Sequence, residues 1–82
     1  MSMSRPSDLE MLAQVRADAA SGLARETRLR ARLSLSEVGA ACKRSGATIS
    51  RWERGELLPR GDSGLRYARL LLRLRSTTEV AS

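Results

Sequence analysis

The 82-residue chain has no histidine, no phenylalanine, one cysteine and two aromatic residues, Trp52 and Tyr67. With Cys42 as its single cysteine the chain cannot form an internal disulfide, and without histidine it offers no plausible zinc cage. Two aromatic side chains are too few for a platform on which bases stack. No acid–base pair, activated nucleophile or phosphate-cradling loop is visible. We therefore expect a protein that is not an enzyme, with no metal, no cofactor and no evident small-molecule substrate.

Long apolar runs and strand patterns are also missing. Uninterrupted apolar runs are no longer than Leu70–Leu72, and residues 1–7 contain none of signal-peptide length. Period-two alternation and hairpin dipeptides are absent, whereas apolar residues recur at intervals of three and four. A chain of this size supports one compact domain. We therefore predict an all-α fold, a cytoplasmic location and no membrane partner.

Positive charge dominates what is present. Fifteen Lys and Arg against nine Asp and Glu give a formal net charge of +6, which favours an anionic partner. Two Arg against three acidic residues leave residues 1–22 at −1, so the remaining +7 lies in residues 23–82. The binding surface is therefore expected after Gly22, and the first segment is better suited to packing.

Capping residues predict the first helix. Ser7, followed three positions later by Glu10, predicts a helix from Asp8 to about Ala20, and Ser21-Gly22 interrupts it. We interpret residues 1–22 as an N-terminal arm or extra helix. Its expected apolar stripe consists of Leu9, Leu12, Val15 and Ala19. A second helix is expected from about Leu23 to Arg32, with Leu29 and Leu33 as its core candidates.

Two short helices are predicted next. Ser34 and Glu37 form a capping box for a helix from Leu35 to Cys42, and Ser45 caps a helix that begins at Gly46 or Ala47 and stops at Gly55. Helices joined by so few residues cross steeply, and Gly39 and Ala40 supply small side chains for the crossing. The expected core of the pair consists of Val38, Cys42, Ile49 and Trp52.

These segments resemble the helix-turn-helix domains of the Cro and phage-repressor family. The resemblance rests on LSLSEVGAAC from Leu33 and on SGATISRWERGELLP from Ser45 to Pro59, and it spans about residues 23–74. We expect the DNA-binding domain over residues 23–75. The resemblance implies a lambda-repressor-like bundle of about five helices with a central helix-turn-helix. Five positions depart from the family pattern: Arg32 and Lys43 replace glycine, Arg44 replaces an apolar residue, and Gly46 and Ala47 replace longer polar side chains. We expect the turn to be reshaped at Lys43 and Arg44.

The resemblance also implies which residues contact double-stranded DNA. The second helix of the motif would enter the major groove. The residues expected to read bases are Arg51, Ala47, Thr48 and Ser50. Those expected to bind phosphates are Lys43, Arg44, Ser45, Gly46, Arg54 and Arg60. Trp52 is expected in the core, and Glu53 is expected to hold the helix or a nearby arginine.

The last predicted helix runs from Gly64 to about Arg75 and has more apolar surface than one small domain needs. We expect a homodimer, with Leu9, Leu12, Leu70 and Leu74 as dimerisation candidates. Arginines on this helix also suit an anionic membrane, but the upstream motif disfavours that hypothesis. Residues 76–82 are expected to form a disordered polar tail.

Together these patterns predict a transcription regulator, a repressor or Cro-like protein of phage or prophage type, that acts by occupying an operator. It would be cytoplasmic, and associated with the nucleoid when bound to DNA. One alternative is a protein-interaction module that uses the same scaffold to bind another regulator. Another is an architectural or excision factor, which would bend DNA.

Overall fold

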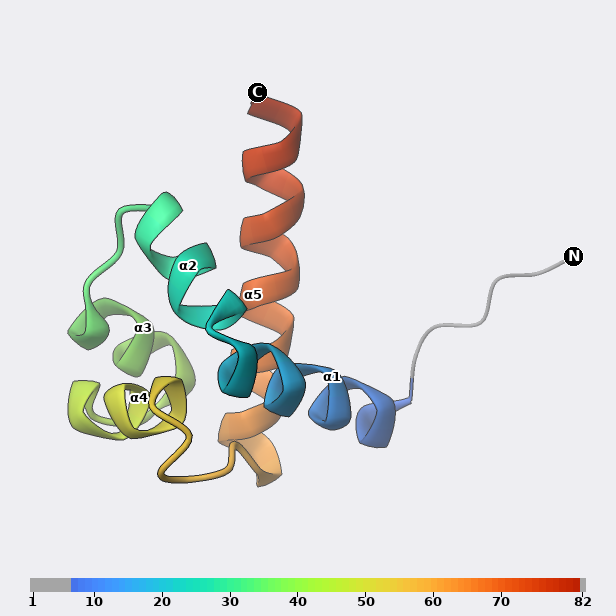
Figure 1. Ribbon diagram of the computed structural model, residues 1–82, viewed down its shortest axis with the longest axis vertical. Helices are drawn as coiled ribbons and strands as arrows, with labels where there is room; N and C mark the ends of the chain where they lie inside the picture. Colours follow the sequence, from blue (N-terminus) through green and yellow to red (C-terminus); the bar gives the residue numbers. More distant parts are fainter. Residues whose placement is uncertain (1–6, 82) are drawn as a thin grey trace, which may run out of the picture.

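The computed structural model describes the backbone of residues 7–81 and the side chains of residues 7–76, and within them it contains helices and no strands. The helices are α1 (Asp8–Ser21), α2 (Leu23–Arg30), α3 (Leu35–Cys42), α4 (Gly46–Glu53) and α5 (Gly61–Ala81). Helix α5 forms the long axis, and the other helices lie around its first half, so that its last turns rise above them (Figure 1). The predicted all-α bundle is confirmed.

Two predicted capping boxes set the starts of α1 and α3. The Glu10 amide donates to Ser7 Oγ at 3.2 Å, and the Ser7 amide donates to Glu10 Oε1 at 2.9 Å. Ser34 and Glu37 make the same reciprocal pair at the start of α3, with distances of 3.0 and 2.8 Å. Each box satisfies two amides that no helical carbonyl reaches. Helix α1 ends at Gly22, which adopts the left-handed conformation with φ of 88°.

Helix α2 is shorter than predicted and presents a different face to the core. It ends at Arg30 rather than Arg32, because Arg32 adopts a left-handed conformation with φ of 59°. Leu29 was predicted in the core and is exposed, so that expectation was wrong. The buried positions of α2 belong to Ala24, Thr27 and Arg28. Polar side chains are tolerated there because each has an internal partner, and the hydroxyl of Thr27 donates to the Leu23 carbonyl at 2.8 Å.

Helix α5 extends beyond both predicted ends. It begins at Gly61 rather than Gly64, and it continues past Arg75 to Ala81. The tail expected over residues 76–82 is therefore helical through Ala81, and Ser82 lies outside the described residues. Residues 76–81 contain neither glycine nor proline, the two residues that most often end a helix, so nothing in this segment stops α5.

The core combines residues of all five helices. The predicted cluster of Val38, Cys42, Ile49 and Trp52 is fully buried. Tyr67 of α5 adds its ring, whose centroid lies 4.8 Å from that of Trp52. The remaining buried apolar residues are Val15, Ala19, Ala24, Ala68 and Leu71. Helix α1 is thus packed on the domain through Val15 and Ala19, whereas Leu9 of its predicted stripe is 74% exposed.

Candidate nucleic-acid interface

Helices α3 and α4 approach each other at backbone distance. A Cβ atom added at Gly39 would lie 2.6 Å from the Arg44 carbonyl oxygen and 2.9 Å from the Ser45 carbonyl carbon. At Gly46 it would lie 3.1 Å from the Ser36 amide nitrogen. Two glycines therefore allow the close crossing. Gly39 was predicted in this role, but Ala40 is exposed and does not take part.

The turn between the two helices is tight despite its charged residues. Lys43 takes φ of 60° and ψ of 42°, the left-handed conformation that glycine adopts at least cost. The Arg44 amide donates to the Gly39 carbonyl at 2.8 Å. Arg44 itself is exposed, and its Nε donates to Ser63 Oγ of α5 at 3.0 Å. Lys43 and Arg44 are both exposed, so their charged side chains lie outside the crossing.

Helix α4 has one buried face and one exposed face. Ile49 and Trp52 are buried, and only 2% of Trp52 is exposed. Ala47 and Arg51 are exposed, and Thr48 and Ser50 are half-buried. The helix starts at Ser45, whose Oγ accepts from the Thr48 amide and forms a further hydrogen bond with Thr48 Oγ1, both at 3.2 Å. Arg51 thus belongs to the exposed face of α4, whereas the neighbouring Trp52 belongs to the buried face.

The predicted phosphate-binding residues lie along α4 and the segments that flank it. Lys43, Arg44, Ser45, Arg54 and Arg60 are exposed, and Gly46 is half-buried. Arg54 Nε lies 3.3 Å from Glu56 Oε2 in an exposed ion pair. Beside α4 a pocket of about 210 Å³ brings Arg44 and Arg60 together at one site. Its other lining residues are Thr48, Trp52, Leu57, Leu58 and Ser63.

A buried ion pair fixes the end of α4 to α2. Arg28 Nε lies 2.6 Å from Glu53 Oε2, and Nη2 donates to Oε1 at 3.0 Å. Nη1 of Arg28 also donates to the Leu33 carbonyl at 2.9 Å. The hydrogen bond to Glu53 raises the pKa of Arg28, so the guanidinium remains charged. The prediction that Glu53 holds a nearby arginine is confirmed, although sequence spacing did not identify Arg28 as the partner.

The loop that follows α4 is held by α1. Arg16 Nε donates to the Pro59 carbonyl at 2.9 Å, across 43 residues of chain, and Pro59 is fully buried. Beyond the loop, Asp62 accepts from Arg66 Nε at 2.8 Å, and this contact lowers the pKa of the Asp62 carboxyl. No local pattern links α1 to a loop so distant in sequence, so the contact between Arg16 and Pro59 went unpredicted. Asp62 and Arg66 are four residues apart on one helix, a spacing that favours an ion pair.

Two buried groups carry no reactive chemistry. Burial raises the pKa of the Cys42 thiol to about 11, so it stays protonated at neutral pH. Burial also raises the pKa of Tyr67, and its hydroxyl lacks a hydrogen-bond partner among the described residues. Within the same residues, no group of His, Cys, Asp or Glu side chains is arranged to hold a metal ion.

No family model, curated protein or solved structure matches this chain. Among the helices that the structure describes, none has the combination of length and apolar character needed to cross a bilayer, α5 included. The geometry of α3 and α4 is therefore the basis for assigning a function.

Proposed function

We propose that the protein is a sequence-specific, double-stranded DNA-binding transcription regulator that acts by occupying its site. The observation that carries the proposal is the two-sided character of α4. Ile49 and Trp52 seal one face against the domain, and the opposite face exposes Ala47 and Arg51. A short helix that packs on the domain through one face and exposes the other suits the major groove, which is wide enough for one α-helix.

Each exposed group on this face has a defined use in the groove. The Arg51 guanidinium would donate twice to O6 and N7 of a guanine, a contact that contributes about 1–3 kcal/mol to discrimination between bases. The Ala47 methyl would contact a thymine methyl. Thr48 and Ser50 carry hydroxyls that would bind a base or a phosphate. Because Gly46 and Ala47 are small, Arg51 would carry most of the sequence preference.

The charges around α4 would position the helix on the duplex. Lys43, Arg44, Arg54 and Arg60 are all exposed, so each can approach one phosphate. Arg44 and Arg54 would do so with the N–H donors that their contacts to Ser63 and Glu56 leave. The N-terminus of α4, with Ser45 and the first amides, would accept a further phosphate. These contacts set affinity and not base preference.

The finer assignment is a repressor or Cro-like regulator of phage or prophage type, located in the cytoplasm and associated with the nucleoid when bound. If two copies bind symmetrically, their half-sites would be about 10–10.5 base pairs apart, one turn of DNA. The resemblance from Ser34 to Pro59 supports this assignment.

The test is selection of bound duplexes from a random pool, followed by gel-shift titration of the selected site at several salt concentrations. Binding should weaken steeply with salt, and Arg51→Ala should abolish preference for the selected site while leaving weak non-specific binding. The matched control is Arg30→Ala, an exposed arginine at the end of α2 that pairs with Glu26 of the same helix. Salt-insensitive binding, or none at low ionic strength, would contradict the proposal.

A further inference from the structure

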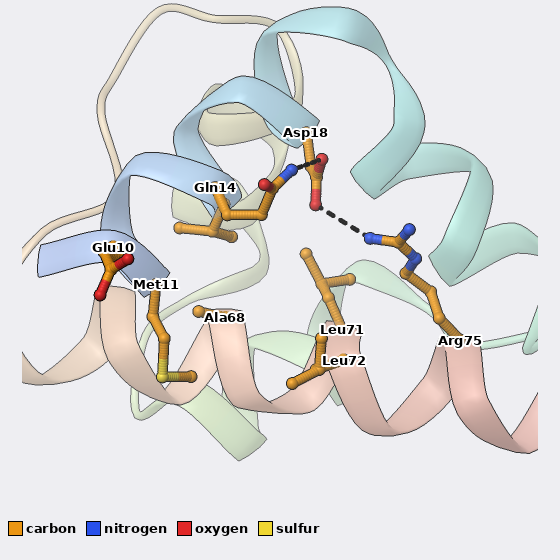
Figure 2. A pocket seen from close by; sticks show the side chains of 9 residues that line it. Glu10, Met11, Gln14, Asp18, Ala68, Leu71, Leu72 and Arg75 are labelled. Atoms are coloured by element: carbon orange, nitrogen blue, oxygen red, sulfur yellow. Dashed lines mark hydrogen bonds and ion pairs between the residues drawn. The ribbon is translucent and has the colours of Figure 1, made fainter. Parts of the chain in front are cut away.

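Two surface cavities among the described residues differ in how their charges are used. A groove of about 260 Å³ lies between α1 and α5, and Arg75, which lines it, forms an ion pair of 3.3 Å with Asp18 (Figure 2). The pocket of about 210 Å³ beside α4 is lined by Arg44 and Arg60, and none of its other described lining residues is acidic. The charge of Arg75 is therefore paired within the groove, whereas the charges of the pocket are not.

The two arginines of the pocket keep most of their hydrogen-bonding capacity. Within the part of the chain whose side chains are described, neither forms an ion pair. Arg44 Nε donates to Ser63 Oγ at 3.0 Å, which leaves the other N–H donors of its guanidinium. The nearby Asp62 accepts from Arg66 Nε at 2.8 Å and does not line the pocket. Two like charges in one small pocket repel each other, and an anion that binds there relieves the repulsion.

Hydrogen bonds from three parts of the chain hold the pocket in shape. Ser63 of α5 is buried, and its hydroxyl donates to the Arg60 carbonyl at 3.4 Å while it accepts from Arg44. The loop before α5 also lines the pocket, and Arg16 of α1 donates to the Pro59 carbonyl of this loop at 2.9 Å. The backbone around the pocket is therefore fixed before a ligand binds, which lowers the entropy cost of binding.

The size and the apolar lining of the pocket indicate the kind of anion. Small-molecule sites usually measure about 300–1,000 Å³, so this smaller pocket suits one phosphate and one small organic group. Leu57 and Leu58 are 40% and 61% exposed, and both line the pocket together with the arginines. A phosphate would accept from the guanidinium groups, and the carbon atoms of an attached sugar would cover the leucines.

We propose that this pocket binds one sugar phosphate, with Arg44 and Arg60 donating to the same phosphate group. A free sugar phosphate and one nucleotide of a DNA strand share this chemistry, and the inference rests on the proposed function for the second source only. The family resemblance does not supply the site, because Arg44 stands where the family has an apolar residue. The arginines that the proposed function assigns to phosphates one by one would here share a single phosphate.

The first test titrates the full chain with deoxyribose phosphate in the absence of DNA, by calorimetry and by the emission of Trp52, which lines the pocket. The wild type should bind, and Arg44→Gln or Arg60→Gln should weaken binding on the order of tenfold, since each loses charged hydrogen bonds. Both arginines are exposed, so the variants should fold. The matched control is Arg30→Gln, an exposed arginine of α2 outside the pocket, which should bind as wild type does.

Two further ligands test which part of the sugar phosphate is recognised. Deoxyribose without its phosphate should not bind, because it offers no charge to the arginines. Inorganic phosphate should bind more weakly than deoxyribose phosphate, because it does not reach Leu57 and Leu58. Equal affinity for the two phosphates would overturn the assignment of a sugar to the pocket.

The second test measures the salt dependence of binding to a duplex, to which each contacted phosphate contributes about 0.9 of slope. If Arg44 and Arg60 share one phosphate, the double variant Arg44→Gln with Arg60→Gln should lower the slope by about one unit. Separate phosphates would lower it by about two. The matched control combines Arg54→Gln with Arg60→Gln, and its effects should add, because Arg54 does not line the pocket.

The outcomes separate the two sources and the two proposals. Binding of deoxyribose phosphate that depends on both arginines supports a free ligand, and a shared phosphate in the duplex supports DNA as the source. If deoxyribose phosphate does not bind, or binds equally to both variants, and the arginines act additively on the duplex, the inference is overturned while the proposed function stands. If no duplex binds, the proposed function fails, and the titration with deoxyribose phosphate alone decides the inference.

Discussion

Helices α3 and α4 are packed in the opposite way to helices α1 and α5. In the first pair the backbones touch, because Gly39 and Gly46 have no Cβ atom at the point of contact. In the second pair a groove of about 260 Å³ lies between the helices and is lined by side chains of both. We call α3 and α4 the closed pair and α1 and α5 the open pair. The closed pair fixes the orientation of α4, whereas the groove of the open pair leaves apolar side chains uncovered.

The change expected to affect the closed pair most is loss of the buried ion pair. In Glu53→Ala the Arg28 guanidinium remains buried without a counter-charge, and its side chain is only 9% exposed. We expect a loss of about 3–5 kcal/mol in the free energy of unfolding, measured by urea titration. The double variant Arg28→Met with Glu53→Leu should recover most of that loss. If Glu53→Ala is as stable as wild type, the ion pair between Arg28 and Glu53 does not fix α4.

The next largest effect is expected at the crossing itself. Gly39→Ala places a methyl group against the backbone of Arg44 and Ser45, which cannot move away as a flexible side chain would. The higher helix propensity of alanine offsets part of the clash, so we expect a net loss of about 1–2 kcal/mol. Ala40→Gly, at the exposed neighbouring position, tests propensity alone and should cost about 1 kcal/mol. Equal unfolding curves for Gly39→Ala and wild type would show that the crossing tolerates a side chain.

A smaller effect of opposite sign is expected at the turn. Lys43→Gly removes a left-handed non-glycine residue, and we expect the protein to gain about 0.5–1 kcal/mol after the added flexibility of the unfolded chain is included. Arg30→Gly, in a helical position, should instead lose about 1 kcal/mol. If Lys43 contacts a phosphate, the same variant should reduce the salt dependence of DNA binding by about one unit of slope. A more stable variant with unchanged salt dependence would separate the two roles.

The smallest effect is expected from the capping carboxylates, one in each pair of helices. Hydrogen bonds from Ser34 lower the pKa of Glu37 below 4.5, and Ser7 does the same for Glu10. A carboxyl with a lowered pKa in the folded state stabilises the fold above its ordinary pKa and stops doing so as the pH falls through the lowered value. The urea midpoint should therefore fall in acid. Glu37→Gln and Glu10→Gln should each flatten that dependence slightly, and an unchanged pH profile would contradict the assignment.

The structure of the closed pair could be predicted because its main contacts join residues that are close in sequence. Ser34, Glu37, Ser45 and Gly39 act on neighbours within a few residues, so their roles can be recognised from spacing. The buried cluster of Val38, Cys42, Ile49 and Trp52 follows from the same periodicity. The conformation of the turn is not marked by such a pattern, because Lys43 adopts the left-handed conformation that glycine more often takes.

The rest of the structure depends on contacts between distant residues. Arg28 reaches Glu53 across 25 residues and Arg75 reaches Asp18 across 57, and no local pattern marks either partner. The error at Leu29 has the same origin. Arg28 is buried because it pairs with Glu53, and the face of α2 that carries it is turned to the core in place of Leu29. The groove also went unpredicted, since its lining combines the two ends of the chain.

The position of Trp52 has a practical consequence. It is the single tryptophan of the chain, it belongs to the buried face of α4, and its ring is close to that of Tyr67. Its intrinsic fluorescence therefore comes from one known place, the junction of α4 with the body of the protein. Any ligand or substitution that loosens this junction should shift the emission to longer wavelength as water reaches the indole, without an attached dye.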